Sequence, residues 1–359
     1  MPQTIKSNFD LQKMFGKPIE EVDAIIANKE KQINKINIPK KDGTLRKVIA
    51  PGKDLKYVQK SLYWRLFGKY KPHNAAHGFV PKRGISTNAD SHVGANSVIK
   101  IDISNFFDSI SVDHLKNCLF GNKHICRDCK HYDRMMVDGA CDPSLYRNKK
   151  TNYKFKCDEI KAVFIPGYCE KTGYSSLFLR VIELCTYNGF TAQGFPTSPV
   201  IANIVLKGFD QTMTKYCEEY NIQYTRYADD LAFSSKTLSK QELQKIIKQK
   251  VYRQLWGYGF KANKKKTCAK SKSGRLKICG VVVNEKKNVQ RDKVKLFRAK
   301  VHHAIVKFAE NTTKKRIKSL KGWASFLMSI NKEQGQKYMN QLVAFETQKF
   351  KSEPQKLKS

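Results

Sequence analysis

The chain has 359 residues, with 68 Lys or Arg against 31 Asp or Glu, so its formal net charge at pH 7 is +37. This excess of cations favours a polyanionic partner, and nucleic acid is preferred to an anionic membrane because no strongly amphipathic basic helix stands out. No stretch reaches the roughly 20 apolar residues of a membrane span, and residues 1–20 lack the apolar core of a signal peptide, so we expect a cytoplasmic protein without a membrane partner.

The first recognisable element is a basic hairpin at residues 36–51. Residues that favour strands flank Asp42-Gly43, a dipeptide that favours a two-residue turn. The arms carry Lys40, Lys41, Arg46 and Lys47. Two interpretations remain open: a hairpin that grips phosphates, or an exposed edge strand protected by lysines.

A helical segment and a strand follow. Residues 85–93 begin with cap-forming residues and lead helically to His92, and a single His there is more often a structural hydrogen-bonding group than a catalyst. Residues 98–109 predict a strand that ends at Asp102, followed by a turn with aromatic residues. An acid at the end of a strand is well placed to bind a metal ion. Asp108 is the alternative ligand from this segment.

Residues 117–172 are rich in cysteine and poorly periodic. The Cys126-Arg-Asp-Cys129 spacing lets two thiolates occupy two corners of a zinc tetrahedron. Free thiols or a redox pair are the alternatives to a structural zinc site. The candidate zinc ligands are Cys126, Cys129, Cys141 and Cys157, with His131 or Cys169 as substitutes.

Two adjacent carboxylates, Asp229 and Asp230, stand in the middle of residues 223–235. The pattern predicts a strand, a tight turn and a second strand, with both acids at the tip. Adjacent carboxylates repel each other and raise each other's pKa. They are either paired with the abundant cations or hold magnesium, and Asp102 offers a third carboxylate for the second case.

The remaining elements surround this hairpin. A tight turn at residues 193–199 starts a helix, a basic loop occupies residues 259–267, and a β-rich run covers residues 276–284. Residues 291–359 are basic and helix-forming, with Trp323 on an apolar face. Three acids, a basic hairpin and a basic helical tail together favour two-metal phosphoryl transfer to nucleic acid.

Three segments resemble the palm motifs of reverse transcriptases. They are KIDISNFFDSI at residues 100–110, QGFPTSPVIANIVL at residues 193–206 and RYADDL at residues 226–231. The resemblance implies an α+β right-hand polymerase with fingers, a palm built on an antiparallel sheet, and a helical thumb. The implied divisions are N-terminal helices and fingers at 1–97, palm at 98–116, a Cys-rich insertion at 117–172, palm with primer grip at 173–285, and basic thumb at 286–359.

The resemblance also implies roles for single residues. Asp102, Asp229 and Asp230 would hold two Mg²⁺ ions, and Phe107 would exclude the ribose 2′-hydroxyl. The implied site for the incoming dNTP comprises Phe107 together with Arg46, Lys40 or Lys41, Gln193 and Lys266.

Residues 77–92 resemble the retron enzymes within this family. Asn88-Ala-Asp-Ser-His92 matches their NAxxH signature, and HGFVPKRGIST precedes it. The resemblance implies RNA or primer contacts for Asn88, His92, Gly280 and Trp323. One departure is Ile278-Cys279-Gly280, which lacks the threonine of the V-T-G that is usual in these enzymes.

A retron enzyme would copy part of a structured non-coding RNA into single-stranded DNA, starting from an RNA 2′-hydroxyl, to give the branched product msDNA. Such systems resemble anti-phage defences with a separate effector protein. The alternatives are another bacterial reverse transcriptase (defence-associated, diversity-generating or group II intron-like) and a catalytically inactive RNA-binding scaffold.

Overall fold

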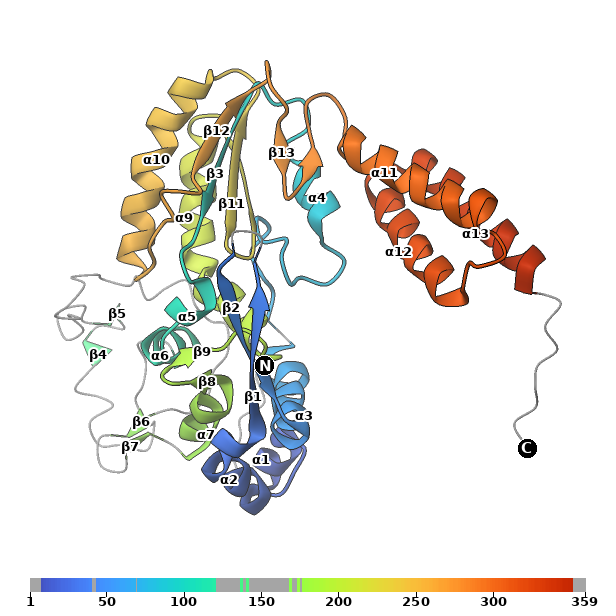
Figure 1. Cartoon of the computed structure of the whole chain (residues 1–359). Coiled ribbons are helices and arrows are strands. Elements are labelled where there is room, and N and C mark those ends of the chain that lie inside the picture. The colour runs from blue at the N-terminus through green and yellow to red at the C-terminus, as the bar shows by residue number, and fades with distance from the viewer. Residues whose placement is uncertain are drawn as a thin grey trace, which may run out of the picture.

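The computed structural model describes residues 8–40, 43–68, 70–120, 136–137, 140–141, 168–169, 173–174 and 176–350. Three parts follow one another in space: an N-terminal group of helices with a hairpin, a four-stranded sheet backed by helices, and a separate arm of helices (Figure 1). No helix among these residues is both long enough and apolar enough to span a bilayer.

The N-terminal part supports a long two-stranded hairpin. Strands β1 and β2 pair antiparallel from Ile33↔Pro51 to Pro39↔Leu45, which confirms the hairpin predicted from the sequence. Its outer half is exposed, whereas Ile33 packs into the core. The elements of this part are α1 (Asn8–Phe15), α2 (Ile19–Ala27), η1 (Lys29–Gln32), β1 (Ile33–Pro39), β2 (Leu45–Pro51), α3 (Lys53–Leu62) and η2 (Tyr63–Phe67).

The central sheet has the order β10-β11-β3-β12, and each neighbouring pair is antiparallel. Its strands are β3 (Ser97–Asp102), β10 (Gln223–Tyr227), β11 (Asp230–Ser235) and β12 (Cys268–Ser271). Strand β3 is buried along nearly its whole length, as expected of a central strand covered on both faces. Helices α9 (Lys207–Glu218) and α10 (Lys240–Gly257) lie along one side of the sheet, and α4 (Ile85–Asp90) lies along the other (Figure 1).

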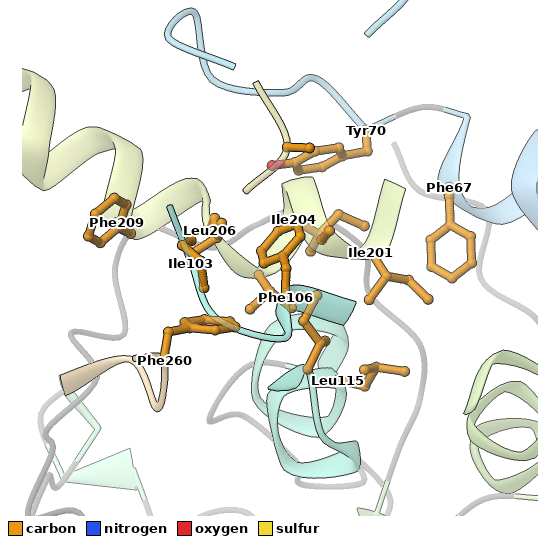
Figure 2. Packing of buried hydrophobic residues seen from close by; sticks show 14 of the residues in the cluster. Phe67, Tyr70, Ile103, Phe106, Leu115, Ile201, Ile204, Leu206, Phe209 and Phe260 are labelled. Carbon is orange, nitrogen blue, oxygen red and sulfur yellow. The ribbon is translucent and has the colours of Figure 1, made fainter. Parts of the chain in front are cut away.

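Below the sheet, a cluster of large apolar side chains fixes the segment that follows β3. Phe106, in the short helix α5 (Phe106–Ser109), lies among Ile204, Leu115 and Phe260 (Figure 2). Burying a phenylalanine contributes about 1.5–3 kcal/mol, so this ring anchors the chain just beyond Asp102. The other helices here are α6 (Val112–Phe120), α7 (Ser176–Cys185) and α8 (Ser198–Val205).

The helical arm confirms the predicted helix-forming character of the C-terminal segment as far as residue 350. It consists of α11 (Arg291–His302), η5 (His303–Lys307), α12 (Lys314–Ile330) and α13 (Lys332–Phe350). Leu320, Leu327 and Leu342 belong to a core that continues into the palm through the hairpin of β13 (Lys277–Ile278) and β14 (Val281–Val282). Trp323 stacks on Phe297 at a ring-centroid distance of 5.0 Å.

Six short strands complete the described chain. They form three two-residue hairpins: β4 (Met136–Val137) with β5 (Ala140–Cys141), β6 (Tyr168–Cys169) with β7 (Gly173–Tyr174), and β8 (Thr186–Tyr187) with β9 (Phe190–Thr191). Most of the Cys-rich segment, including Cys126, Cys129 and Cys157, lies outside the described residues.

Candidate active site

Strand pairing brings the three predicted acids to one end of the central sheet. Asp230 opens β11 and pairs directly with Asp102, the last residue of β3. The β10–β11 turn passes through Ala228, whose φ of 57° is left-handed, and the carbonyl of Asp229 accepts a hydrogen bond from the Ile103 N–H at 3.0 Å. The predicted hairpin with both acids at its tip is therefore confirmed, and the third acid lies on the neighbouring strand.

These carboxyl groups lie in a setting that disfavours their charge. The pKa of Asp229 is raised to about 6, chiefly by burial and in smaller part by the charges of Asp102 and Asp230, against the opposing effects of a backbone hydrogen bond and of Lys266. Burial is also the main reason why the pKa of Asp230 is raised. The site is thus short of positive charge, which is the condition under which bound cations relieve repulsion between carboxylates.

Lys266 supplies part of that missing charge. Its Nζ lies 3.2 Å from Oδ2 of Asp102. The backbone N–H of Asn263 donates to the Asp102 carbonyl at 2.7 Å, and the Thr267 hydroxyl donates to the Asn263 carbonyl at 3.0 Å. The loop that carries Lys266 is therefore fastened to the end of β3 rather than merely close to it.

A buried ion pair supports the turn from behind. Arg226 donates through Nε to Oδ1 of Asp210 at 2.8 Å and through Nη2 to Oδ2 at 2.6 Å, and both side chains are fully buried. Arg226 also donates to the Ala228 carbonyl at 3.3 Å, and Tyr224 donates to Asp210 at 2.8 Å. Sequence reasoning missed this pair. Its only signal was an acid next to Phe209 in an otherwise apolar helical stretch.

The loop at residues 73–78 backs the same turn through its main chain. The Arg226 N–H donates to the Ala75 carbonyl at 2.7 Å, and the His77 N–H donates to the Arg226 carbonyl at 2.8 Å. A Cβ on Gly78 would lie 2.5 Å from the backbone nitrogen of Ala228. Only glycine permits this close approach between the two backbones.

The residues expected at the dNTP come from the β1–β2 hairpin, the helix α5 after β3, the loop before α8 and the loop that carries Lys266. The carbonyl of Gln193 accepts a hydrogen bond from the Ile49 N–H of β2 at 2.8 Å, which joins the fingers to the palm. The half-buried ring of Phe107 lies 6.1 Å from the ring of Phe79. Arg46 and Lys40 are exposed near the tip of the hairpin, and Lys41 lies outside the described residues.

Asn88 and His92, which were expected to contact RNA or primer, are both buried, with at most 1% of each residue exposed. The two ring nitrogens of His92 each lie 2.7 Å from a hydroxyl, that of Ser234 on β11 and that of Thr225 on β10. Burial lowers its pKa to about 3, so the imidazole is neutral. His92 is thus the structural hydrogen-bonding group favoured for a single histidine.

Asn88 connects the same helical segment to the β13–β14 turn. Its amide nitrogen lies 3.3 Å from Sγ of Cys279. Cys279 and Gly280 both have positive φ, 46° and 84°, as in a type I′ hairpin turn. Burial raises the pKa of the Cys279 thiol to about 12, and the charge of Asp230 contributes, so the turn lies close to the acidic site.

The described residues contain no set of three His, Cys, Asp or Glu side chains close enough to hold a metal ion as they stand. The zinc hypothesis is untested, since of its four main ligands only Cys141 falls in a described strand, and only its backbone is described there.

The family described as reverse transcriptase (RNA-dependent DNA polymerase) matches residues 148–283, a range that includes Asp229 and Asp230. The chain is 26% identical over 356 residues to the retron Ec86 reverse transcriptase of Escherichia coli, covering 98% of this chain and 92% of that protein. It is 27% identical over 325 residues to the retron Mx162 reverse transcriptase of Myxococcus xanthus, covering 86% of this chain and 60% of that protein. Among solved structures, a telomerase of Candida albicans in complex with a telomeric RNA fragment gives a TM-score of 0.42 at 10% identity. The match covers 98% of this chain and 68% of the telomerase chain.

Proposed function

We propose that the chain is a reverse transcriptase, an RNA-directed DNA polymerase like the retron enzymes to which it is similar, and that it copies part of a structured non-coding RNA into single-stranded DNA. The observation that carries the proposed chemistry is the pairing of Asp230 with Asp102 next to Asp229. Nucleotidyl transfer needs carboxylates gathered at one point, and this register gathers three.

The acidic site fits a pair of magnesium ions by its chemistry. Its donors are all carboxylate oxygens, which Mg²⁺ prefers, and burial, aided by the charges of Asp102 and Asp230, raises the pKa of Asp229. Asp102, Asp229 and Asp230 would hold the ions, after side-chain adjustment from the positions described here. When bound, the ions would activate the attacking hydroxyl and neutralise the leaving pyrophosphate.

The surrounding residues would position the substrates. The side chain of Lys266 is 63% exposed beside Asp102, so it would be able to give a proton or a hydrogen bond to the leaving pyrophosphate. The ring of Phe107 would meet the sugar of the incoming nucleotide, and Gln193 would lie next to its base. Arg46, with Lys40 or Lys41, would hold the triphosphate when the exposed hairpin tip closes on it. The Gly280 turn and Trp323 on the thumb would contact the primer and RNA.

We infer the biological setting from the retron relatives. The product would be msDNA primed from an RNA 2′-hydroxyl, made in the cytoplasm, and the complex would restrain a separate effector protein in anti-phage defence. The proposed boundaries of fingers, palm, insertion and thumb are those expected from the sequence.

We propose that the Cys-rich insertion holds one structural zinc ion. Elemental analysis of the wild type should find about one zinc per chain, and the Cys126→Ser protein should have lost it.

The chemistry is tested by replacing one carboxylate. We expect Asp229→Ala to abolish cDNA synthesis from the copurified RNA with Mg²⁺ and dNTPs, while RNA affinity in a filter-binding assay stays within about threefold. An active Asp229→Ala enzyme would refute the assignment, whereas an inactive wild type that still binds RNA would favour the scaffold alternative.

Sequencing the nucleic acid that copurifies with the protein tests the retron role. A branched RNA–DNA species with one RNA template and a fixed priming nucleotide is the expected result. Unbranched cDNA, or cDNA from many templates, would favour another kind of bacterial reverse transcriptase. Loss of phage resistance on deleting the gene tests the defence role.

A further inference from the structure

A groove of about 720 Å³ lies between the C-terminal end of α9, with the turn that follows it, and the face of α10 from Glu242 to Arg253. Both helices lie on the side of the palm sheet away from α4 and the β13 hairpin (Figure 1). The aromatic and charged residues that line the groove are Tyr216, Tyr220, Glu242, Lys245, Lys250 and Arg253. None of them belongs to the acidic site described above.

Two tyrosines give the groove an aromatic wall. Their rings lie 5.1 Å apart and are inclined by 52°. Tyr216 is fixed, because its hydroxyl donates to the Ile246 carbonyl at 3.3 Å and Nζ of Lys250 lies 4.5 Å from its ring centroid. Tyr220 is 42% exposed and open to a further stacking partner.

The charge of the groove is positive. Lys245, Lys250 and Arg253 face it with one acid, Glu242. Glu242 is already used as part of a helix cap: it accepts a hydrogen bond from the Ser239 N–H at 2.8 Å, and its hydrogen bonds with Ser239 lower its pKa. Within the described part of the chain, none of the three cations is paired with a carboxylate. An exposed aromatic ring beside cations that no carboxylate neutralises is an arrangement suited to single-stranded nucleic acid.

We propose that this groove binds a single strand of nucleic acid, with one base stacked on Tyr220 and neighbouring phosphates held by Lys245, Lys250 and Arg253. The strand is either a segment of the RNA or the newly made DNA, which share a sugar–phosphate backbone and stackable bases. The inference rests on the proposed function, which supplies both kinds of strand, the RNA template and the DNA product. An acidic peptide would satisfy the cations but leave the open ring without its partner.

The test uses the full chain with its catalytic cleft filled by excess unlabelled primer–template duplex. Fluorescent 12-nucleotide RNA and DNA strands of one sequence serve as separate probes. We expect Tyr220→Ala to weaken binding of the preferred probe about tenfold, from the loss of one stacked base. Tyr220→Phe, which keeps the ring, should bind like wild type.

The cations are tested through salt dependence. The double variant Lys245→Gln/Arg253→Gln should reduce the slope of log affinity against log salt by about 1.4, since each phosphate contact to a single strand contributes about 0.7. Lys248→Gln is the matched control, because Lys248 lies on α10 but does not line the groove. It should lower the slope by less than about a third of that amount.

The rate of primer extension on a short annealed template distinguishes a failure of the groove proposal from a failure of the proposed polymerase function. All groove variants should extend it within about twofold of wild type, as they lie away from the acidic site. Unchanged probe affinity in Tyr220→Ala, or an equal loss in Lys248→Gln, would overturn the groove proposal while leaving the polymerase intact. Binding of fluorescent polyglutamate that Lys245→Gln/Arg253→Gln weakens, with no measurable binding of either oligonucleotide probe, would assign the groove to an acidic protein instead.

Discussion

The carboxyl group of Asp229 lies in a buried setting that disfavours its ionised form. Its pKa is about 6 in the folded protein against a usual 3.8, so the folded state holds this proton more tightly than the unfolded state does. The destabilisation is therefore absent below pH 3.8, grows as the pH rises, and is complete above about pH 6. At neutral pH the ionised carboxyl weakens the fold in the absence of a bound cation.

Replacing this carboxyl by a neutral amide should reveal that cost. In EDTA at pH 7.5 we expect Asp229→Asn to raise the free energy of unfolding by on the order of 2 kcal/mol, measured by denaturant titration. The gain should shrink as the pH falls from 6 to 4. Asp113→Asn is the control, because the Asp113 side chain is 74% exposed, and it should change stability little. A gain of Asp229→Asn that does not depend on pH would contradict the assigned cause.

At the scale of elements, the junction between β2 and the palm depends on one glycine. Gly194 has a φ of +120°, and a Cβ there would lie 2.5 Å from the Ile49 carbonyl. Any side chain would push the turn away from β2 and break the hydrogen bond between Gln193 and Ile49. The hairpin that carries Arg46 would then lose its fixed position relative to the acids.

Gly194→Ala should therefore raise the KM for dNTPs more than tenfold in steady-state primer extension. Gly189→Ala is a matched comparison, because Gly189 has a φ of +80° but no atom within 4 Å of the point that a Cβ would occupy. It should cost only the backbone strain of about 1–2 kcal/mol and leave the KM close to wild type. Similar KM values for the two variants would show that the junction does not control nucleotide binding.

At the scale of the whole molecule, the charge of +37 should dominate RNA affinity. Helix α11 alone carries Arg291, Lys293, Lys295, Arg298 and Lys300 on the arm that extends from the palm (Figure 1). If six to ten phosphates are contacted, affinity for the copurified RNA should fall by about 10³–10⁵ between 50 and 200 mM salt. Filter binding across this range measures the slope, and a nearly flat response would show that charge is not the main source of affinity.

Local patterns predicted much of the molecule. The β1–β2 hairpin and the β10–β11 turn could be predicted because alternation and turn residues act over a few positions. Asp102 was predicted as a third carboxylate of the site from its place at the end of a strand. The register that pairs it with Asp230 was not predicted, because pairing between strands far apart in the sequence depends on tertiary packing. The burial of Asn88 and His92 was not predictable, because helical periodicity does not say which neighbouring strands a helix meets. The ion pair of Arg226 with Asp210 joins residues whose proximity depends on the same tertiary packing.

The close approach of Gly78 to the β10–β11 turn restricts which substitutions this protein can accept near its acidic site. The turn and the loop at residues 73–78 are in contact backbone to backbone, so neither can shift without the other. Selection for new substrates would then find few single substitutions that move the acids. Diversity should accumulate instead in side chains that reach the site from the fingers hairpin and the β13–β14 turn, where replacements leave the main chain in place.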